Sequence, residues 1–561
     1  MTEPPRAGAA TAAPVPPAAP PAHRGRYFFS RTNARYPLSL TCGATVVATA
    51  VLLPVAFLIW QATHTGWGLI GRLLFRRLTL TLLVNTAELT IAVTVCAAVL
   101  SVAAAWFVER TDLPGRGLWR AVLIVPLAIP DFVVGYTWSS LSPAVHGLGG
   151  AVLVMTLALY PLAYLPVAAA LRRADTSVYE VARSLGHGRA AAFWRAIVPQ
   201  IRSAILGGAM LVALAILAEY GAFEILRFQT FTTEIFSEFS LGFDTSAASA
   251  LSLLLVVASL LVLAAERAAA RSAASTSPGS VRATGVRRYH LGWSRIPALA
   301  GLTALAGLGV GVPVATLAYW LTQPAATTLP PIPLGGALGH TLAYSAGAAA
   351  LATAAALPVA FLAVRWPGRL SLLLERAGYL VQGLPGLVIA LSLVFFAVHA
   401  VYPLYQSPLL LVIAYAVMFF PLALVSLRVS LAQAPRRLAE LARSLGCRPM
   451  GAMLRVTLPL AAPGIAASAA LVFLSAVTEL TATLVLIPSG ANTLATAFWA
   501  YQSDVSYAAA SRYAAVIVVI AVVPGIFLQR WLDSGRPRGR LRGRLHGRGA
   551  GVATGAATRD G

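Results

Sequence analysis

One stretch of this chain occurs twice at a fixed separation, and it restricts the fold more than any other feature. It reads EVARSLGHGRAAAFWRAIVPQ at 180–200 and ELARSLGCRPMGAMLRVTLPL at 440–460. Self-similarity at a fixed offset is typical of duplicated structural units. The chain is therefore predicted to contain two copies of one unit. Four residue types recur 260 positions apart, as Glu180/Glu440, Ala182/Ala442, Gly186/Gly446 and Pro199/Pro459.

Each copy has the sequence pattern of a helix, a turn and a second helix. The residues before Gly186 favour a helix, and Gly186 can adopt the left-handed backbone that ends one. A second helical run, 190–198, is predicted to stop at Pro199 because proline lacks the N–H that continues a helix. Arg183 and Arg443 occupy matching positions in the first helix of each copy.

Two interpretations of this repeated stretch differ in function. A single copy fits a solvated connection between two membrane helices. Matching residues in both copies instead favour an equivalent binding surface on each half. Glu180 and Glu440 also fit a local role as carboxylates near a helix start, where the helix dipole favours negative charge. The local role and the binding role are compatible.

The composition indicates a membrane protein. Of 561 residues, 58% are hydrophobic and 11% are charged, whereas soluble domains are about 25% charged. Runs of about 20 apolar residues, enough to cross the hydrocarbon core as a helix, recur along the chain. We predict an all-α polytopic fold of about twelve transmembrane helices, arranged as two parallel six-helix repeats. Spans are expected at 38–60, 80–108, 118–140, 148–171, 204–226, 247–265, 296–321, 341–364, 377–401, 409–427, 465–487 and 513–531.

Arginine placement predicts the orientation, because cytoplasmic loops of membrane proteins carry an excess of cations. Both termini, the central linker and both repeated stretches are therefore predicted to be cytoplasmic. Three arginines on the opposite side, Arg72, Arg76 and Arg77, break the rule and fit an interfacial helix. The arginine-rich segments that agree with the orientation rule are 110–120, 172–202, 267–295, 365–376 and 436–455.

Other matched positions support the duplication. Thr86 corresponds to Thr341 and Pro130 to Pro385, both 255 positions apart. Prolines inside a span invite a kink, which here is either a gating bend or a tolerated irregularity. Pro161 and Pro421 return to the offset of 260.

Two carboxylates, Glu219 and Glu479, are the candidates for a translocation pathway. They lie in the fifth and eleventh predicted spans, again 260 positions apart. An acidic residue inside a membrane helix is costly and usually faces the bundle interior or water. A structural carboxyl bonded to a neighbouring helix is the equal alternative. Asp131 ranks lower because its counterpart is Gly386.

Several functions are disfavoured. The chain has no lysine, so it cannot supply the P-loop lysine that binds ATP phosphates. Cys42, Cys96 and Cys447 have neither metal-site nor disulfide spacing. No catalytic residue, metal site or bound cofactor is predicted. The basic segment 533–561 is expected to attract anionic lipid rather than nucleic acid.

The pattern Glu-x-Ala-x-x-x-Gly, followed by a hydrophobe and proline, resembles the coupling loop of the permease subunits of binding-protein-dependent ATP-binding cassette importers. In that family the loop is cytoplasmic and docks into a groove on the ATPase. Val181 and Leu441 stand where the usual motif has alanine, a mild departure. The resemblance implies as partners two copies of a cytoplasmic ATPase, which uses the ATP, and an extracytoplasmic binding protein. It assigns ATPase coupling to Glu180, Ala182, Arg183, Gly186, Pro199, Glu440, Ala442, Arg443, Gly446 and Pro459.

The expected organisation is a multi-pass protein of the cell membrane. Its first permease unit spans 38–267 and its second 296–532, with coupling loops at about 172–202 and 428–463. Residues 1–37 are expected to form a disordered cytoplasmic tail, 268–295 a cytoplasmic linker and 533–561 a basic cytoplasmic tail.

The expected substrate follows from resemblance alone. The fused two-unit layout and the segments after Leu217 and Val477 look most like ferric-iron importer permeases. Thiamine, phosphonate and polyamine permeases are similar in form. The alternative class is an ion-coupled secondary transporter, which would leave the repeated helix-glycine-helix stretch unexplained. Dependence of uptake on a separate ATPase distinguishes the two classes.

Overall fold

The computed structural model describes residues 38–65, 68, 71–72, 75–240, 245–274 and 288–534. Within these ranges the regular structure is helical, apart from one isolated bridge between Thr111 and Tyr289. The all-α prediction is therefore confirmed. The predicted N-terminal tail, most of the linker and almost all of the basic C-terminal tail lie outside the described residues.

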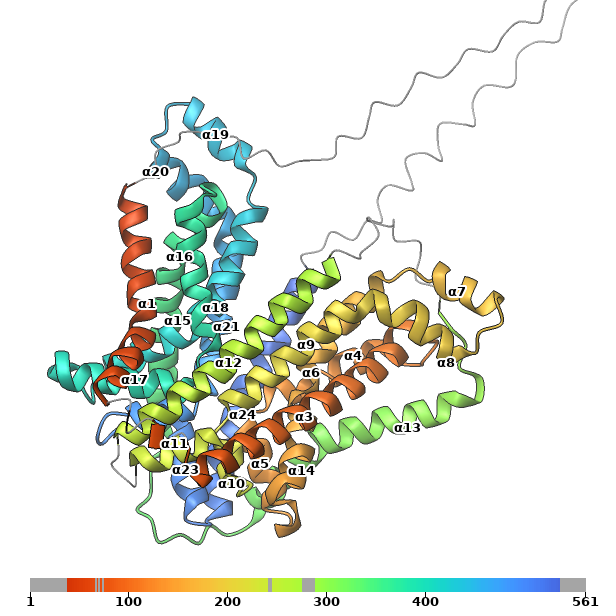
Figure 1. The fold of residues 1–561 in the computed structure, drawn as a ribbon, viewed down its shortest axis with the longest axis horizontal. Helices are drawn as coiled ribbons and strands as arrows, with labels where there is room; N and C mark the ends of the chain where they lie inside the picture. Colours follow the sequence, from red (N-terminus) through yellow and green to blue (C-terminus); the bar gives the residue numbers. More distant parts are fainter. Residues whose placement is uncertain are drawn as a thin grey trace, which may run out of the picture.

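The helices of the first half follow the predicted order (Figure 1). They are α1 (Leu38–Thr65), α3 (Arg77–Arg110), α4 (Arg116–Val122), α5 (Asp131–Ser139), α6 (Gly147–Arg173), α7 (Ser177–Ser184), α8 (Arg189–Ala192), α9 (Val198–Ala218), α10 (Gly221–Ile225), α11 (Phe231–Ser240) and α12 (Thr245–Ala274).

The second half repeats this plan. Its helices are α13 (Arg295–Ala306), α14 (Val312–Thr322), α15 (Leu334–Arg365), α16 (Arg369–Leu380), α17 (Gly386–Ala400), α18 (Pro408–Gln433), α19 (Arg436–Ser444), α20 (Pro449–Ala452), α21 (Leu458–Val477), α22 (Thr481–Leu486), α23 (Leu494–Ser503) and α24 (Tyr507–Ser534).

Nine helices in the described ranges are long and apolar enough to cross a membrane, and two bent helix pairs raise the number to 11. A shorter apolar helix covers Tyr507–Val522. The structure thus supports a polytopic fold of roughly the predicted size, and the count of twelve remains a prediction.

The third span of each half is sharply bent, where the sequence predicted one continuous run. The bends are 89° between Arg116–Ala128 and Asp131–Ser139, and 107° between Arg369–Gly383 and Gly386–Ala400. Pro130 and Pro385 lie at the two breaks and share the backbone angles φ −59°, ψ 142°. Proline cannot donate the next helical hydrogen bond and forces the preceding residue to be extended. The predicted kinks are confirmed at both prolines.

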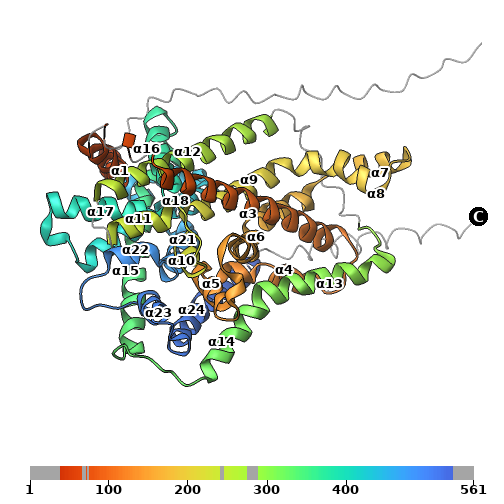
Figure 2. The ribbon, with the colours of Figure 1, turned by 60° about the horizontal axis from the view of Figure 1, so that its bottom comes forward.

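Each half contributes helices to the core of the other. The core of the second half includes Leu58 of α1 and Leu251 of α12, whereas the core of the first half includes Leu302 of α13 and Phe498 of α23. Helix α1 packs on α15, α16 and α17, and α14 packs on α5 (Figure 2). Some helices of each sequence repeat therefore pack on the other repeat, so that neither half has a complete core alone.

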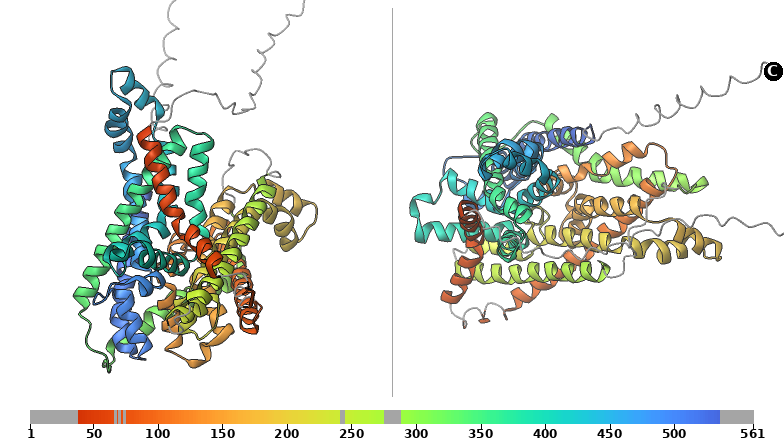
Figure 3. Two further views of the ribbon diagram at one scale, coloured as in Figure 1. Left: turned by 60° about the vertical axis from the view of Figure 1, so that its left-hand side comes forward. Right: turned by 90° about the horizontal axis from the view of Figure 1, so that it is seen from above.

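The two bundles diverge from a common base (Figures 1 and 3). Helices α5, α10 and α23 lie at the base where the halves meet, and α7 and α19 lie at the far ends of the diverging bundles. The two repeated stretches are thus widely separated, while the breaks that follow α9 and α21 lie near the junction. In the predicted orientation the cytoplasmic ends are the separated ones.

Arg76, one of the three arginines that break the orientation rule, has a structural partner. Its guanidinium lies 3.0 Å from the Glu238 carboxylate and 3.6 Å from that of Glu234, both on α11. This arginine therefore ties the start of α3 to α11. No comparable partner explains Arg72 and Arg77 within the described residues.

A buried carboxylate joins three helices at the loop end of the first bundle. The Glu109 side chain is 1% exposed and accepts hydrogen bonds from Arg120 at 2.9 and 2.5 Å and from Arg172 at 2.7 Å. In the second half Glu375 occupies the position that matches Arg120, and it pairs with Arg428. Each bundle therefore has a buried ionic tie, but the two ties use different positions, since Val364 matches Glu109 and Ala168 matches Arg428.

We expect Glu109→Gln to lower the stability of the purified protein. The substitution removes the counter-charge of two arginines and leaves charge-assisted hydrogen bonds unmade, which costs about 1–3 kcal/mol. Thermal unfolding in detergent measures the loss. Glu88→Gln on the same helix is the control, since Glu88 is exposed. Equal melting of the two variants would contradict the assigned role.

Candidate coupling surface

The glycines of the two repeated stretches end their helices in the same way. Gly186 has φ +87° and Gly446 has φ +90°. The Gly186 N–H donates to the Arg183 carbonyl at 3.1 Å, and the His187 N–H donates to the Ala182 carbonyl at 3.2 Å. This pair of bonds is the Schellman motif of a helix C-terminus. The second copy repeats both bonds at 3.0 Å, with Gly446 to Arg443 and Cys447 to Ala442.

The prediction that Pro199 stops the second helix is wrong. A π-helical turn, Phe193–Ile197, joins α8 to α9, and the Val198 N–H donates to the Phe193 carbonyl. The wider turn makes room for the ring of Pro199, which would otherwise clash with the carbonyl four residues earlier. The second copy has the same turn at Met453–Thr457, before Pro459. Each proline therefore lies in the first turn of a long membrane helix.

Both loops expose apolar side chains that the sequence interpretation overlooked. Val181 and Leu441 are 56% and 57% exposed, and Leu185 and Leu445 are 72% and 79% exposed. Apolar residues spaced by three and four within a polar helix were the signal that could have identified them. Exposed apolar groups at matched positions indicate a protein-binding surface. The remaining exposed pairs are Val178 with Leu438 and Trp194 with Leu454.

The glutamates and arginines of the motif lie on this surface. Glu180 is in the first turn of α7, so its predicted place near a helix start is confirmed. Glu440 is not in the first turn, because α19 begins earlier, at Arg436. Arg183 donates to the His187 carbonyl at 2.8 Å, within its own loop. Glu440 and Arg443 line a depression together with Ser444 and Cys447.

Aromatic side chains fix the first loop to the bundle. The ring of Tyr179, which is buried, lies 4.8 Å from that of Tyr289 in the linker. Trp106 of α3 packs between Tyr289, at 5.6 Å, and Phe193, at 4.8 Å. In the second loop Ala439 occupies the position of Tyr179. The two loops therefore differ in how they are anchored.

The linker itself is bound to the first half. The Tyr289 N–H donates to the Arg110 carbonyl at 2.9 Å, next to the bridge with Thr111. Asp112 accepts a hydrogen bond from the Leu291 N–H at 3.0 Å. This bond, with those from His290 and Arg295, lowers the pKa of the Asp112 carboxyl, so that the contact is ionic at neutral pH.

The sequence predicted that Glu219 and Glu479 lie within membrane helices, but in the structure they lie at helix breaks. Glu219 follows the last residue of α9, and its Oε1 accepts from the Ala222 N–H at 2.8 Å. Glu479 follows α21, and its Oε1 accepts from the Ala482 N–H at 3.0 Å. Each carboxylate thus caps the short helix that follows it, which compensates for the broken backbone hydrogen bonds. The pathway role stays a prediction.

No group of three or more His, Cys, Asp or Glu side chains is placed to hold a metal ion within the part of the chain that the structure describes. The coupling residues and the two pathway candidates also form separate sets, because the repeated stretches lie at the start of α9 and α21, whereas Glu219 and Glu479 follow the ends of these helices. The exposed apolar side chains of the two loops are typical of a docking surface.

Comparison with known proteins supports the duplication. The family of binding-protein-dependent transport system inner membrane components matches two segments, residues 114–274 and 352–536. Each segment contains one of the two repeated stretches.

Individual relatives match either most of this chain or less than half of it. The Fe(3+)-transport system permease protein FbpB 2 of Haemophilus influenzae is 37% identical over 503 residues, which cover 89% of this chain and 99% of that protein. The sulfate transport system permease protein CysT of Escherichia coli is 26% identical over 249 residues, covering 41% of this chain and 90% of that protein. The molybdenum transport system permease protein ModB of Escherichia coli is 30% identical over 135 residues, covering 21% of this chain and 58% of that protein. This chain therefore belongs to the family of binding-protein-dependent transport system inner membrane components, the permeases of ATP-binding cassette importers, and carries two family units in one polypeptide.

Proposed function

We propose that this permease imports ferric iron. The observation that carries the proposal is the similarity to an Fe(3+)-transport permease along almost the entire length of both chains. The alignments with the sulfate and molybdenum permeases cover 41% and 21% of this chain. The permease has no enzymatic activity and no cofactor of its own, and it provides the path through which a partner ATPase drives the ion.

The partners are two copies of a cytoplasmic ATPase and an extracytoplasmic binding protein. Two matched coupling loops, each with exposed apolar side chains at equivalent positions, support two docking sites for identical subunits. Closure of the ATPase pair would bring α7 and α19 together and open the opposite end of the bundles. The residues assigned to coupling are Glu180, Ala182, Arg183, Gly186, Pro199, Glu440, Ala442, Arg443, Gly446 and Pro459.

The proposed orientation places both termini and both coupling loops in the cytoplasm. Glu219 and Glu479 then lie toward the outer end, where the halves meet, as candidates for contact with the passing ion. The basic segment 533–561 would contact anionic lipid. Thiamine, phosphonate and polyamine remain the alternative substrates.

Uptake of radiolabelled ferric iron by iron-starved cells tests the proposal. Deletion of this gene is expected to abolish uptake, and re-expression is expected to restore it only in cells that also have the ATPase. Unchanged uptake in the deletion strain, without induction of another iron transporter, would reject iron as the substrate. Uptake that persists without the ATPase would reject ATP-driven transport.

A further inference from the structure

The connection between α6 and α7, residues 174–176, is held by side chains of two other helices. From α3, the Arg110 guanidinium donates to the Ala174 carbonyl at 2.5 Å, and this arginine is 1% exposed. From α9, the Gln200 amide bonds to both backbone groups of Asp175. Its Oε1 accepts from the Asp175 N–H at 2.8 Å, and its Nε2 donates to the Asp175 carbonyl at 3.1 Å. We call these two bonds the Gln200 clasp.

The Gln200 clasp closes the base of the first coupling loop. Asp175 and Gln200 are 25 positions apart, at the two ends of the segment that carries α7 and α8. The Gln200 Nε2 also donates to the Ala196 carbonyl at 2.7 Å, which orients the amide on its own helix. The clasp therefore ties the beginning of the loop directly to the first turn of α9.

Asp175 extends this connection to the docking helix itself. Its Oδ1 accepts from the Ser177 N–H, at the first residue of α7, at 2.8 Å. This bond, with a smaller contribution from the charge of Arg110, lowers the pKa of the Asp175 carboxyl, so that the group is ionised at neutral pH. A continuous set of hydrogen bonds therefore runs from the start of α7 through Asp175 to Gln200 on α9.

The second coupling loop cannot form the same clasp. The offset of 260 places Pro435 where the first half has Asp175, and Leu460 where it has Gln200. Proline has no N–H to donate, and the leucine side chain has no polar atom. The arginine is retained, since Arg365 of α15 donates to the Ala434 carbonyl, but at 3.4 Å. The bases of the two loops are therefore built differently, although the loops end their docking helices in the same turn.

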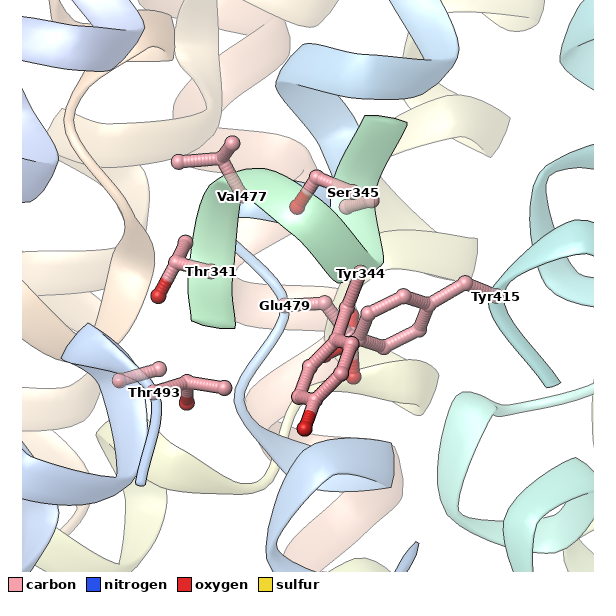
Figure 4. Close-up of a pocket in the computed structure, with 9 residues that line it drawn as sticks. Thr341, Tyr344, Ser345, Tyr415, Val477, Glu479 and Thr493 are labelled. Carbon is pink, nitrogen blue, oxygen red and sulfur yellow. The ribbon is translucent and has the colours of Figure 1, made fainter. Parts of the chain in front are cut away.

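The helices that follow the two loops both lead to the junction of the halves. Helix α9 ends immediately before Glu219. Helix α21 ends shortly before Glu479, which lies near Tyr344 of α15 and Tyr415 of α18 (Figure 4). A rigid element of this kind can carry a displacement from one end to the other. What differs between the halves is how firmly the loop is joined to that element.

We propose that Gln200 is a positioning residue for transport, which makes α7 move as one body with α9 when the ATPase acts on the first loop. The second loop, without the clasp, can bend at its base and passes on less of its displacement. This inference rests on the proposed docking of an ATPase at both loops. Gln200 contacts neither the transported ion nor the exposed apolar side chains, and it acts only through the backbone of Asp175.

Hydrogen–deuterium exchange of the purified, full-length permease tests the clasp without ATPase or substrate. Gln200→Leu introduces the residue that the second half carries at this position, where it is 47% exposed. We expect residues 175–184 to exchange about fivefold faster or more, because two hydrogen bonds at the loop base are lost. Leu460→Gln is the matched control and is expected to leave exchange of the second loop unchanged, since Pro435 has no N–H. Equal exchange in Gln200→Leu and the wild type would overturn the proposal.

Coupled assays test the positioning role. Proteoliposomes with the permease, its ATPase and the binding protein report the ferric iron moved per ATP hydrolysed. Gln200→Leu is expected to lower this ratio about threefold or more, and Leu460→Gln to leave it unchanged. A residue that only stabilised the fold would reduce the amount of active complex without changing the ratio. A wild-type ratio in Gln200→Leu would overturn the positioning role, whereas absence of iron uptake by the wild-type complex would instead reject the proposed function.

Discussion

Replacing Gly186 and Gly446 together with valine is expected to abolish uptake while the partner ATPase continues to hydrolyse ATP. Both glycines have a left-handed backbone, with φ +87° and +90°. An L-residue there costs roughly 1–2 kcal/mol, and a β-branched side chain is especially disfavoured. No heavy atom lies within 4 Å of an added Cβ at either position. The cost therefore comes from the backbone, which loses the Schellman bonds that position each docking helix.

A matched control separates backbone strain from added bulk. Gly188 lies two residues after Gly186 in the same loop, has φ −60° and also has open space around it. Its counterpart in the second half is Arg448, so the position accepts a side chain. Gly188→Val should leave uptake and ATP hydrolysis coupled. Parallel assays of both activities in proteoliposomes measure the effect, and normal uptake by the double glycine variant would refute the docking assignment.

Gly208→Val is expected to prevent correct folding of the first bundle. A Cβ at Gly208 would lie 2.6 Å from the Cα of Ala163 on α6, a contact with backbone that cannot move aside. Small residues let membrane helices approach closely, and overpacking typically costs about 1–3 kcal/mol. The second half has Ser468 at this position, and its Oγ lies 3.4 Å from the Ala423 carbonyl. At this contact the first bundle has no room for a side chain, whereas the second accommodates a serine.

The adjacent Gly207 provides the control for Gly208→Val. It lies on the same helix, and an added Cβ meets no atom within 4 Å. Gly207→Val should yield monodisperse protein by size-exclusion chromatography in detergent, at wild-type amounts. Gly208→Val should yield little or aggregated protein. Equal yields and equal melting temperatures for the two variants would contradict this prediction, because they would mean that α6 and α9 can move apart without loss of stability.

The sequence was sufficient to predict the duplication, the helical fold and the glycine turns, because each depends on local or periodic signals. Gly186 and Gly446 are examples, since residue type alone restricts their backbone. The kinks were likewise predicted from residue type alone, at Pro130 and Pro385. The breaks at Glu219 and Glu479 were not predicted, because both lie in long apolar runs and only the first has a glycine nearby, Gly221. In both, the carboxylate itself accepts a hydrogen bond from the interrupted backbone.

Long-range packing explains the remaining differences. The π-helical turn before Pro199 depends on a helix that continues into the membrane, whereas a proline read locally indicates a stop. The exchange of α1 and α14 between the halves depends on contacts that no periodicity encodes. The ion pair between Arg76 and Glu238 on α11 could not be predicted either, because the two residues are distant in sequence.

The bound linker makes the two arms of this permease mechanically unequal. Tyr289 holds Tyr179 and Trp106 together, so a displacement of α7 must carry the linker and the end of α3 with it. Helix α19 has alanine at the equivalent position and therefore lacks the tyrosine ring that anchors α7. We therefore expect that α7 resists displacement more than α19 does when the partner ATPase acts on both loops. Two units of one fused chain would then respond unequally, although their docking helices end in the same turn.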